Sequence, residues 1–373
     1  MFLISFARIE SQFIKDVVKD VIGKLTPRYP NELKGLVGIE KSFKQIESLL
    51  KIGSSEVRTV GIWGMGGIGK TTLAIALYDK LSHEFEGRCV LTNIREKSDK
   101  LEGLRDELLS KLLGNKIHGI DYFDMRRLQR KKVFIVLDDV DTSEQIEKLI
   151  LEYEFLGPGS KVIVTTRNKQ ILSLVDEIYQ VEELSSYHSL QLFCLTISGE
   201  KQPKDGYEDL SKRAILYCKG LPMALKVLGS NLRKKSKVVW ECELRKLQKI
   251  PNVQIHNVLK LSYECLDRSQ KDIFLDIVCF FNGWERDRVT YILEACDFFA
   301  ASGIETLLDK TLVTISNYSH IKVNDLIQKM GWEIVHQESI KDLGRRSRLW
   351  KQEEVYDVLK YNKVTIRCGI ASI

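Results

Sequence analysis

One short segment carries the clearest chemical signal in this sequence. Residues 64–71 read Gly-Met-Gly-Gly-Ile-Gly-Lys-Thr, which matches the spacing G-x-x-x-x-G-K-[ST] of a phosphate-binding loop. The glycines let successive backbone amides point into one concavity, and the start of a helix adds partial positive charge there. Lys70 is expected to reach the β- and γ-phosphates of a nucleotide, and the Thr71 hydroxyl is expected to ligate Mg²⁺. Further nucleotide contacts are assigned to Gly64, Gly66, Gly67, Ile68, Gly69 and Thr72.

Two adjacent carboxylates follow an apolar run at residues 132–137. In an open α/β sheet, ligands bind just outside the carboxyl ends of the strands, so these side chains are expected near the phosphate loop. Asp138 is predicted to be the second Mg²⁺ anchor beside Thr71, and Asp139 is a candidate base that orients or activates a water. The alternative is that both residues only form a turn at the end of the strand.

An arginine follows another apolar run, at residues 160–165. A guanidinium group can make a bidentate contact with phosphate oxygens. Arg167 is therefore predicted to sense the γ-phosphate, and the alternative is an arginine that only faces solvent.

The order of apolar runs and helical patterns predicts the elements that position these groups. Up to about residue 180, short apolar runs typical of buried parallel strands alternate with helical patterns. The predicted strands are 57–63, 88–91, 132–137 and 160–165, and the predicted helices are 70–82, 101–113 and 143–151. This βαβ series predicts an α/β P-loop NTPase domain with a parallel sheet flanked by helices.

Helical patterns dominate the rest of the chain. Two short apolar runs, 312–315 and 320–323, predict a hairpin before a last helix that starts at Asp325. Several helices followed by a small hairpin form the outline of a winged-helix domain. The predicted divisions are a helical connector at 1–30, the P-loop domain at 31–182, an all-α domain at 183–252, a winged-helix domain at 253–350 and a divergent tail at 351–373.

Composition and charge exclude several classes of protein. Of 373 residues, 44% are hydrophobic and 29% are charged, as in ordinary globular proteins, and a net charge of +6 does not require a nucleic-acid partner. The eight cysteines include no Cys-x-x-Cys pair, which argues against a cysteine metal site and favours reduced thiols in the cytoplasm or nucleus. We expect no signal peptide, and no apolar stretch approaches the roughly 20 residues of a membrane span. Three basic clusters, at 126–132, 233–237 and 345–348, are expected to face solvent.

Six motifs in a fixed order carry a family resemblance. The chain resembles the NB-ARC region of plant intracellular immune receptors of the nucleotide-binding leucine-rich-repeat class. Asp141, residues 93–96 (NIRE) and the FLDIVCFF run resemble the subclass with an N-terminal TIR domain, although we expect this chain to lack both the TIR domain and the repeats. The motifs are 60–73 (VGIWGMGGIGKTTL), 132–141 (KVFIVLDDVD), 159–167 (GSKVIVTTR), 220–225 (GLPMAL), 274–283 (FLDIVCFFNG) and 323–335 (VNDLIQKMGWEIV).

The resemblance implies further contacts to an adenine nucleotide. Val37, Gly38 and Ile39 resemble the edge that contacts adenine, although they can equally be a plain strand or turn. Pro222 resembles the residue that packs on the nucleotide, and a proline after Gly-Leu is also suited to a first helical turn. The family's Met-His-Asp is here Val-Asn-Asp, so Asn324 replaces a histidine that contacts the ADP β-phosphate. Asn324 can alternatively cap the helix that follows.

These observations predict a molecular switch that uses ADP, ATP and Mg²⁺. ADP favours a closed resting form, ATP favours an open active form, and hydrolysis is at most slow and resets the switch. The alternatives are an ordinary P-loop ATPase, a DNA-binding regulator that uses residues 345–351, and a truncated partner or decoy of full-length receptors. The expected partners are the nucleotide, a second copy of the chain or a full-length receptor, with no nucleic acid and no membrane.

Overall fold

The computed structural model describes residues 36–114, 122–150, 156–296, 298–361 and 369–370. The predicted connector at 1–30 lies outside these residues. The chain forms two compact units, and each is described by itself. The first unit contains 36–63, 70–166 and 171–181, and the second contains 64–69, 167–170 and the chain from Glu182 onward.

A parallel sheet of five strands forms the centre of the first unit. Its strands are β1 (Arg58–Trp63), β2 (Gly87–Leu91), β3 (Val133–Val140), β4 (Lys161–Thr166) and β5 (Glu177–Gln180). Their order is β2-β3-β4-β1-β5, and every neighbouring pair is parallel. The predicted α/β class is confirmed. The edge strand β5 was not predicted, because it is mostly exposed and has no apolar run.

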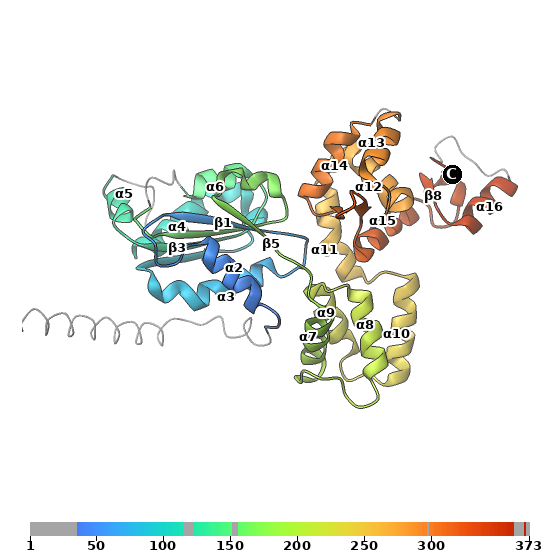
Figure 1. Cartoon of the computed structure of the whole chain (residues 1–373), viewed down its shortest axis with the longest axis horizontal. Helices are drawn as coiled ribbons and strands as arrows, with labels where there is room; N and C mark the ends of the chain where they lie inside the picture. Colours follow the sequence, from blue (N-terminus) through green and yellow to red (C-terminus); the bar gives the residue numbers. More distant parts are fainter. Residues whose placement is uncertain (1–35, 115–121, 151–155, 297, 362–368, 371–373) are drawn as a thin grey trace, which may run out of the picture. The chain divides into compact units, whose positions relative to one another are not determined.

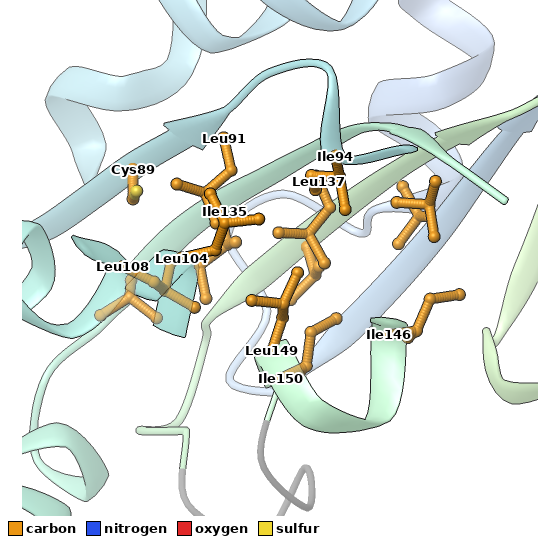
Figure 2. Close-up of a cluster of buried hydrophobic side chains, with 14 of the residues drawn as sticks. Cys89, Leu91, Ile94, Leu104, Leu108, Ile135, Leu137, Ile146, Leu149 and Ile150 are labelled. Carbon is orange, nitrogen blue, oxygen red and sulfur yellow. The ribbon is translucent and has the colours of Figure 1, made fainter. Parts of the chain in front are cut away.

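Helices cover both faces of this sheet (Figure 1). Successive side chains of a strand point to opposite faces, so Phe134 and Val136 belong to one core cluster, while Ile135 and Leu137 belong to the other. Figure 2 shows the second of these clusters, in which strand side chains face leucines and isoleucines of two helices. The helices of the unit are α2 (Glu40–Leu49), α3 (Lys70–Leu81), α4 (Leu101–Leu113), α5 (Tyr122–Gln129) and α6 (Ser143–Ile150).

The second unit is mostly helical, as the sequence patterns indicate. Its first four helices are α7 (Ser186–Ser198), α8 (Glu208–Cys218), α9 (Pro222–Leu232) and α10 (Lys237–Lys249). They are followed by α11 (Val253–Glu264), α12 (Arg268–Asp276), a π-helical turn (Ile277–Phe281), α13 (Arg286–Glu294) and α14 (Ala300–Asp309). The predicted hairpin is present as β6 (Thr314–Ile315) and β7 (Ile321–Lys322), before α15 (Asp325–Glu338). A short β8 (Arg348–Leu349), α16 (Gln352–Lys360) and β9 (Gly369–Ile370) follow.

The expectation that residues 345–348 form a solvated basic cluster is wrong for two of its arginines. Arg346 and Arg348 are buried, and only Arg345 is exposed. Arg348 Nε lies 2.5 Å from Asp276 Oδ1, and Arg348 Nη2 lies 3.1 Å from Asp272 Oδ1. Both guanidinium groups are inside because carboxylates and carbonyls pair with them there, which offsets the loss of hydration.

Within the described residues, no helix is long and apolar enough to cross a membrane.

Candidate functional site

The glycine-rich loop joins the end of β1 to the start of α3, which is the context that a phosphate loop requires. Gly64, Gly67 and Gly69 have φ angles of 155°, 78° and 101°, a region that favours glycine. Lys70 begins the helix and is buried. The loop therefore has the backbone freedom to turn several amides toward one anion.

The two predicted metal ligands lie together in the first unit. Thr71 Oγ1 donates a hydrogen bond to Asp138 Oδ1 at 2.7 Å, and Thr165 Oγ1 donates to the same oxygen at 2.6 Å. Asp138 is almost fully buried, and this burial raises the pKa of its carboxyl, while the Thr165 and Thr71 hydroxyls act in the opposite direction. Two threonines thus hold the carboxylate at the end of β3.

A hydroxyl and a single carboxylate fit Mg²⁺ better than the metals that prefer nitrogen or sulfur. Mg²⁺ commonly takes one or two protein oxygens and completes its shell with phosphates and waters. Within the described residues, no group of three or more His, Cys, Asp or Glu side chains could hold a metal ion. Thr71 and Asp138 are therefore the residues that would hold the ion.

Asp139 has a partner that sequence reasoning missed. Its backbone is left-handed, with φ of 55°, and the pairing of β3 with β4 is irregular there. Its amide donates to Thr165 Oγ1 at 2.9 Å, and its Oδ2 lies 2.9 Å from Arg95 Nη2. Arg95 lies in the 3₁₀ segment Ile94–Lys100 that follows β2. Because β2 is the neighbour of β3, residues at the carboxyl ends of these two strands lie close together.

Arg167, the predicted γ-phosphate sensor, lies directly after β4 and belongs to the second unit. Its Nη1 donates to the carbonyl oxygen of Val258 at 3.0 Å. A Cβ added at Gly66 would lie 2.9 Å from the same Nη1 atom. The guanidinium therefore lies directly against the phosphate loop, and Gly66 permits this close approach.

The N-terminus of α9 also contacts the phosphate loop, again within the second unit. Pro222 occupies the first turn of α9, as its alternative interpretation predicted. The next amide, that of Met223, donates to the Gly67 carbonyl oxygen at 3.1 Å. A Cβ at Gly69 would lie 3.8 Å from Pro222 Cγ, so the proline is close to the loop.

The two remaining predicted contacts lie at the start of helices. Val37, Gly38 and Ile39 lie in an irregular segment before α2, with a bend at Gly38, rather than in a strand, and Gly38 has a φ of 72°. Asn324 caps α15, because its Oδ1 accepts from the Leu326 amide at 2.9 Å. Its Nδ2 donates to Glu183 Oε1 at 2.5 Å. Contact of these residues with a nucleotide stays a prediction.

Comparison with known proteins adds an independent observation. A model of the NB-ARC domain matches residues 39–202, and a model of the Roq1-like winged-helix domain of disease resistance proteins matches residues 267–339. The disease resistance protein RUN1 of Vitis rotundifolia is 45% identical over 91% of this chain. The TMV resistance protein N of Nicotiana glutinosa is 39% identical over 96% of it. The chain covers 26% and 32% of these two relatives.

Among solved structures, a Walker-type ATPase of Pyrococcus abyssi has a TM-score of 0.56 and covers 80% of this chain and 96% of its own. Sequence identity is only 13%, so the likeness concerns the fold alone. It agrees with the P-loop NTPase fold of this chain.

Proposed function

Because this chain belongs to the NB-ARC family of plant disease resistance proteins, we propose that it binds an adenine nucleotide with Mg²⁺ and acts as a switch between an ADP-bound resting state and an ATP-bound active state. The observation that carries the proposal is the hydrogen bond between Thr71 Oγ1 and Asp138 Oδ1, next to a glycine loop with three positive φ angles. These are the residue types and the spacing that hold a phosphate-bound metal.

Each residue of the site has one task in this proposal. The loop amides and Lys70 would bind the phosphates, and Thr71 and Asp138 would hold the ion, which would supply positive charge to the phosphates. Thr165 orients Asp138 and accepts from the Asp139 amide, so one hydroxyl fixes both carboxylates. Asp139 orients the water of a slow hydrolysis that resets the switch.

The two states differ in the contacts made by the second unit. Arg167 now donates to the Val258 carbonyl oxygen, and a γ-phosphate would compete with that oxygen for the guanidinium. Contacts of Pro222 and Asn324 with ADP favour the ADP-bound resting state over the ATP-bound state. A shift from 1:99 to 99:1 requires about 5.5 kcal/mol of differential binding. Hydrogen bonds to charged groups contribute about 1.5–3 kcal/mol each, so two to four such contacts suffice.

The test is to purify the chain, release its bound nucleotide with acid and identify it by chromatography. We expect ADP or ATP in near-stoichiometric amount from the wild type and none from Lys70→Ala. The control is Lys80→Ala, in the last turn of the same helix, where the lysine pairs with Glu47 at the surface. Folded wild-type protein with no nucleotide and no Mg²⁺-dependent uptake of ADP or ATP would disprove the proposal.

A further inference from the structure

A cavity of about 200 Å³ lies in the helical part of the second unit, among α7, α8, α9 and α10. Its buried lining is mostly apolar and includes Cys194, Leu232 and Trp240. The Trp240 indole N–H already donates to the Leu232 carbonyl oxygen at 2.9 Å, so the ring needs no polar partner from the cavity. Phe193 and Tyr207 pack edge-on against this indole, with ring centroids 5.8 and 5.0 Å away. The indole is therefore packed between two aromatic rings as well as hydrogen-bonded.

One polar side chain on this lining has no hydrogen-bond partner within the described residues. The side chain of Ser211 lines the cavity, and the residue is only 1% exposed. Thr196 and Ser198 lie in helices too, and their hydroxyls donate to carbonyls four residues earlier, at 2.8 and 3.1 Å. Within the described part of the chain, the Ser211 hydroxyl makes no such bond and has no other partner. A hydroxyl can both donate and accept a hydrogen bond, so the Ser211 side chain can bond to a molecule in the cavity.

The rim of the cavity carries strong positive charge. Lys204, Lys234 and Lys235 line it, and no carboxylate does. All three lysines are exposed, and none has an ion-pair partner among the residues that the structure describes. Lys234 and Lys235 belong to the basic cluster at 233–237, which the sequence pattern assigned only to solvent. Several like charges over a low-dielectric wall attract an anion.

We propose that this cavity binds a small organic carboxylate whose apolar body is about the size of one substituted six-membered ring. An apolar cavity of about 150 Å³ accepts benzene, so 200 Å³ leaves room for a ring with a short side chain. The ring lies against Trp240 and Leu232, and the carboxylate lies between the ammonium groups of the rim. No glycine is among the residues that line the cavity, in contrast to the phosphate loop. This site is separate from the proposed nucleotide site.

The test uses 3-phenylpropanoate and its neutral analogue 3-phenylpropanamide as probes for the full chain, titrated by calorimetry without nucleotide. We expect saturable binding of the carboxylate at a single site and about tenfold weaker binding of the amide. The double variant Lys234→Glu/Lys235→Glu should weaken carboxylate binding by about tenfold or more and leave amide binding unchanged. The matched control Lys246→Glu/Lys249→Glu makes the same charge change at exposed positions of α10 outside the cavity and should have little effect.

Filling the cavity tests its location. Ser211→Leu should abolish binding of both probes, with circular dichroism used to check the fold, and Cys194→Met serves the same purpose if the first variant does not fold. Equal affinity for the two probes would overturn the proposal, as would full binding to a folded cavity-filled variant. Equal weakening by the rim variant and its control would also overturn it, because attraction would then come from net charge alone. None of these results depends on nucleotide binding, so they are independent of the proposed switch.

Discussion

Arg95 Nη2 lies 2.9 Å from Asp139 Oδ2, and both side chains are more than four-fifths buried. A pair this shielded is held more firmly than a surface ion pair. Asp139 is also fixed through its amide, which donates to Thr165 Oγ1. Arg95 therefore restrains the Asp139 carboxylate, and under the proposed function it would also restrain the water that this carboxylate orients.

The first prediction concerns this positioning. Arg95→Ala should lower the single-turnover rate of ATP hydrolysis by about tenfold to a hundredfold while ATP affinity changes little, because a small displacement of a catalytic group costs that much. Arg95→Lys should recover part of the rate. The control is Lys100→Ala, an exposed residue at the end of the same 3₁₀ segment. An unchanged or faster rate in Arg95→Ala would show that Arg95 has no positioning role or restrains Asp139 instead.

The Arg95–Asp139 pair also shows what sequence reasoning could and could not predict. Lys70, Thr71 and Asp138 were predicted because each lies in a short local motif with a fixed chemical task. The contact between Arg95 and Asp139 requires β2 to lie beside β3. Neither local motif indicates the order of the strands in the sheet.

The same contrast applies to the fold. Strands β1 to β4 were predicted because both faces of the sheet are covered, so these strands are nearly continuous apolar runs. The edge strand β5 is exposed and lacks such a run. Arg348 was assigned to the surface from its charge alone, because its partners Asp272 and Asp276 lie 76 and 72 residues earlier. Non-local pairing of this kind has no signal in a local pattern.

The second prediction concerns stability and the pair of Arg348 with Asp276. Arg348→Met should destabilise the chain by about 3–5 kcal/mol, because it leaves a buried carboxylate without its partner. Arg345→Met, at an exposed neighbouring position, should change stability by less than about 0.5 kcal/mol. Chemical denaturation measures both, and adding Asp276→Leu to Arg348→Met should restore part of the loss. Equal effects of the two arginine variants would contradict the role assigned to the buried pair.

The buried arginines also bear on DNA binding, an alternative raised from the basic segment 345–351. Arg346 donates to the Ser339 carbonyl oxygen and pairs with Glu354, and Arg348 pairs with two aspartates. Guanidinium groups used in this way are not available to phosphates of a duplex. In the structure, these two arginines instead make ion pairs and hydrogen bonds within the fold.

The third prediction is a dependence of stability on pH through His256. Burial lowers the pKa of this histidine, and its Nδ1 is buried without a hydrogen-bond partner within the described residues. The unfolded state therefore takes up a proton at a higher pH than the folded state. Neutral His256 contributes to the stability of the folded state above the pKa that the histidine has in the unfolded state, near 6.5. This contribution is lost as pH falls through the lower pKa of the histidine in the folded state.

Replacing His256 with Gln removes this titration. Wild-type melting temperature should fall more steeply than that of His256→Gln between about pH 7 and pH 5. The control is His83→Gln, in the short 3₁₀ turn Ser82–Glu84 of the first unit, which should follow the wild type. Parallel curves for wild type and His256→Gln would refute the assignment.

The last prediction separates two roles of Asn324, helix cap and nucleotide contact. Its Oδ1 accepts from the Leu326 amide, and its Nδ2 donates to Glu183 Oε1. Asn324→Asp keeps the cap, because aspartate caps a helix as well as asparagine does. However, it replaces the donor with a second negative charge beside Glu183 and beside any phosphate bound there. Because the cap is kept, capping should stabilise α15 in this variant as it does in the wild type. ADP, however, should dissociate faster.

Asn324→His has the opposite charge consequence. Its protonated ring would add an ionic contact to a phosphate, so ADP should dissociate about tenfold more slowly, as expected for one charge-assisted hydrogen bond. Stopped-flow release of a fluorescent ADP analogue measures both rates. Asn324→Ala is the reference for the cap, since its loss costs about 1 kcal/mol of stability. If the aspartate and histidine variants release ADP at the wild-type rate, Asn324 serves only to begin α15 and to bond to Glu183.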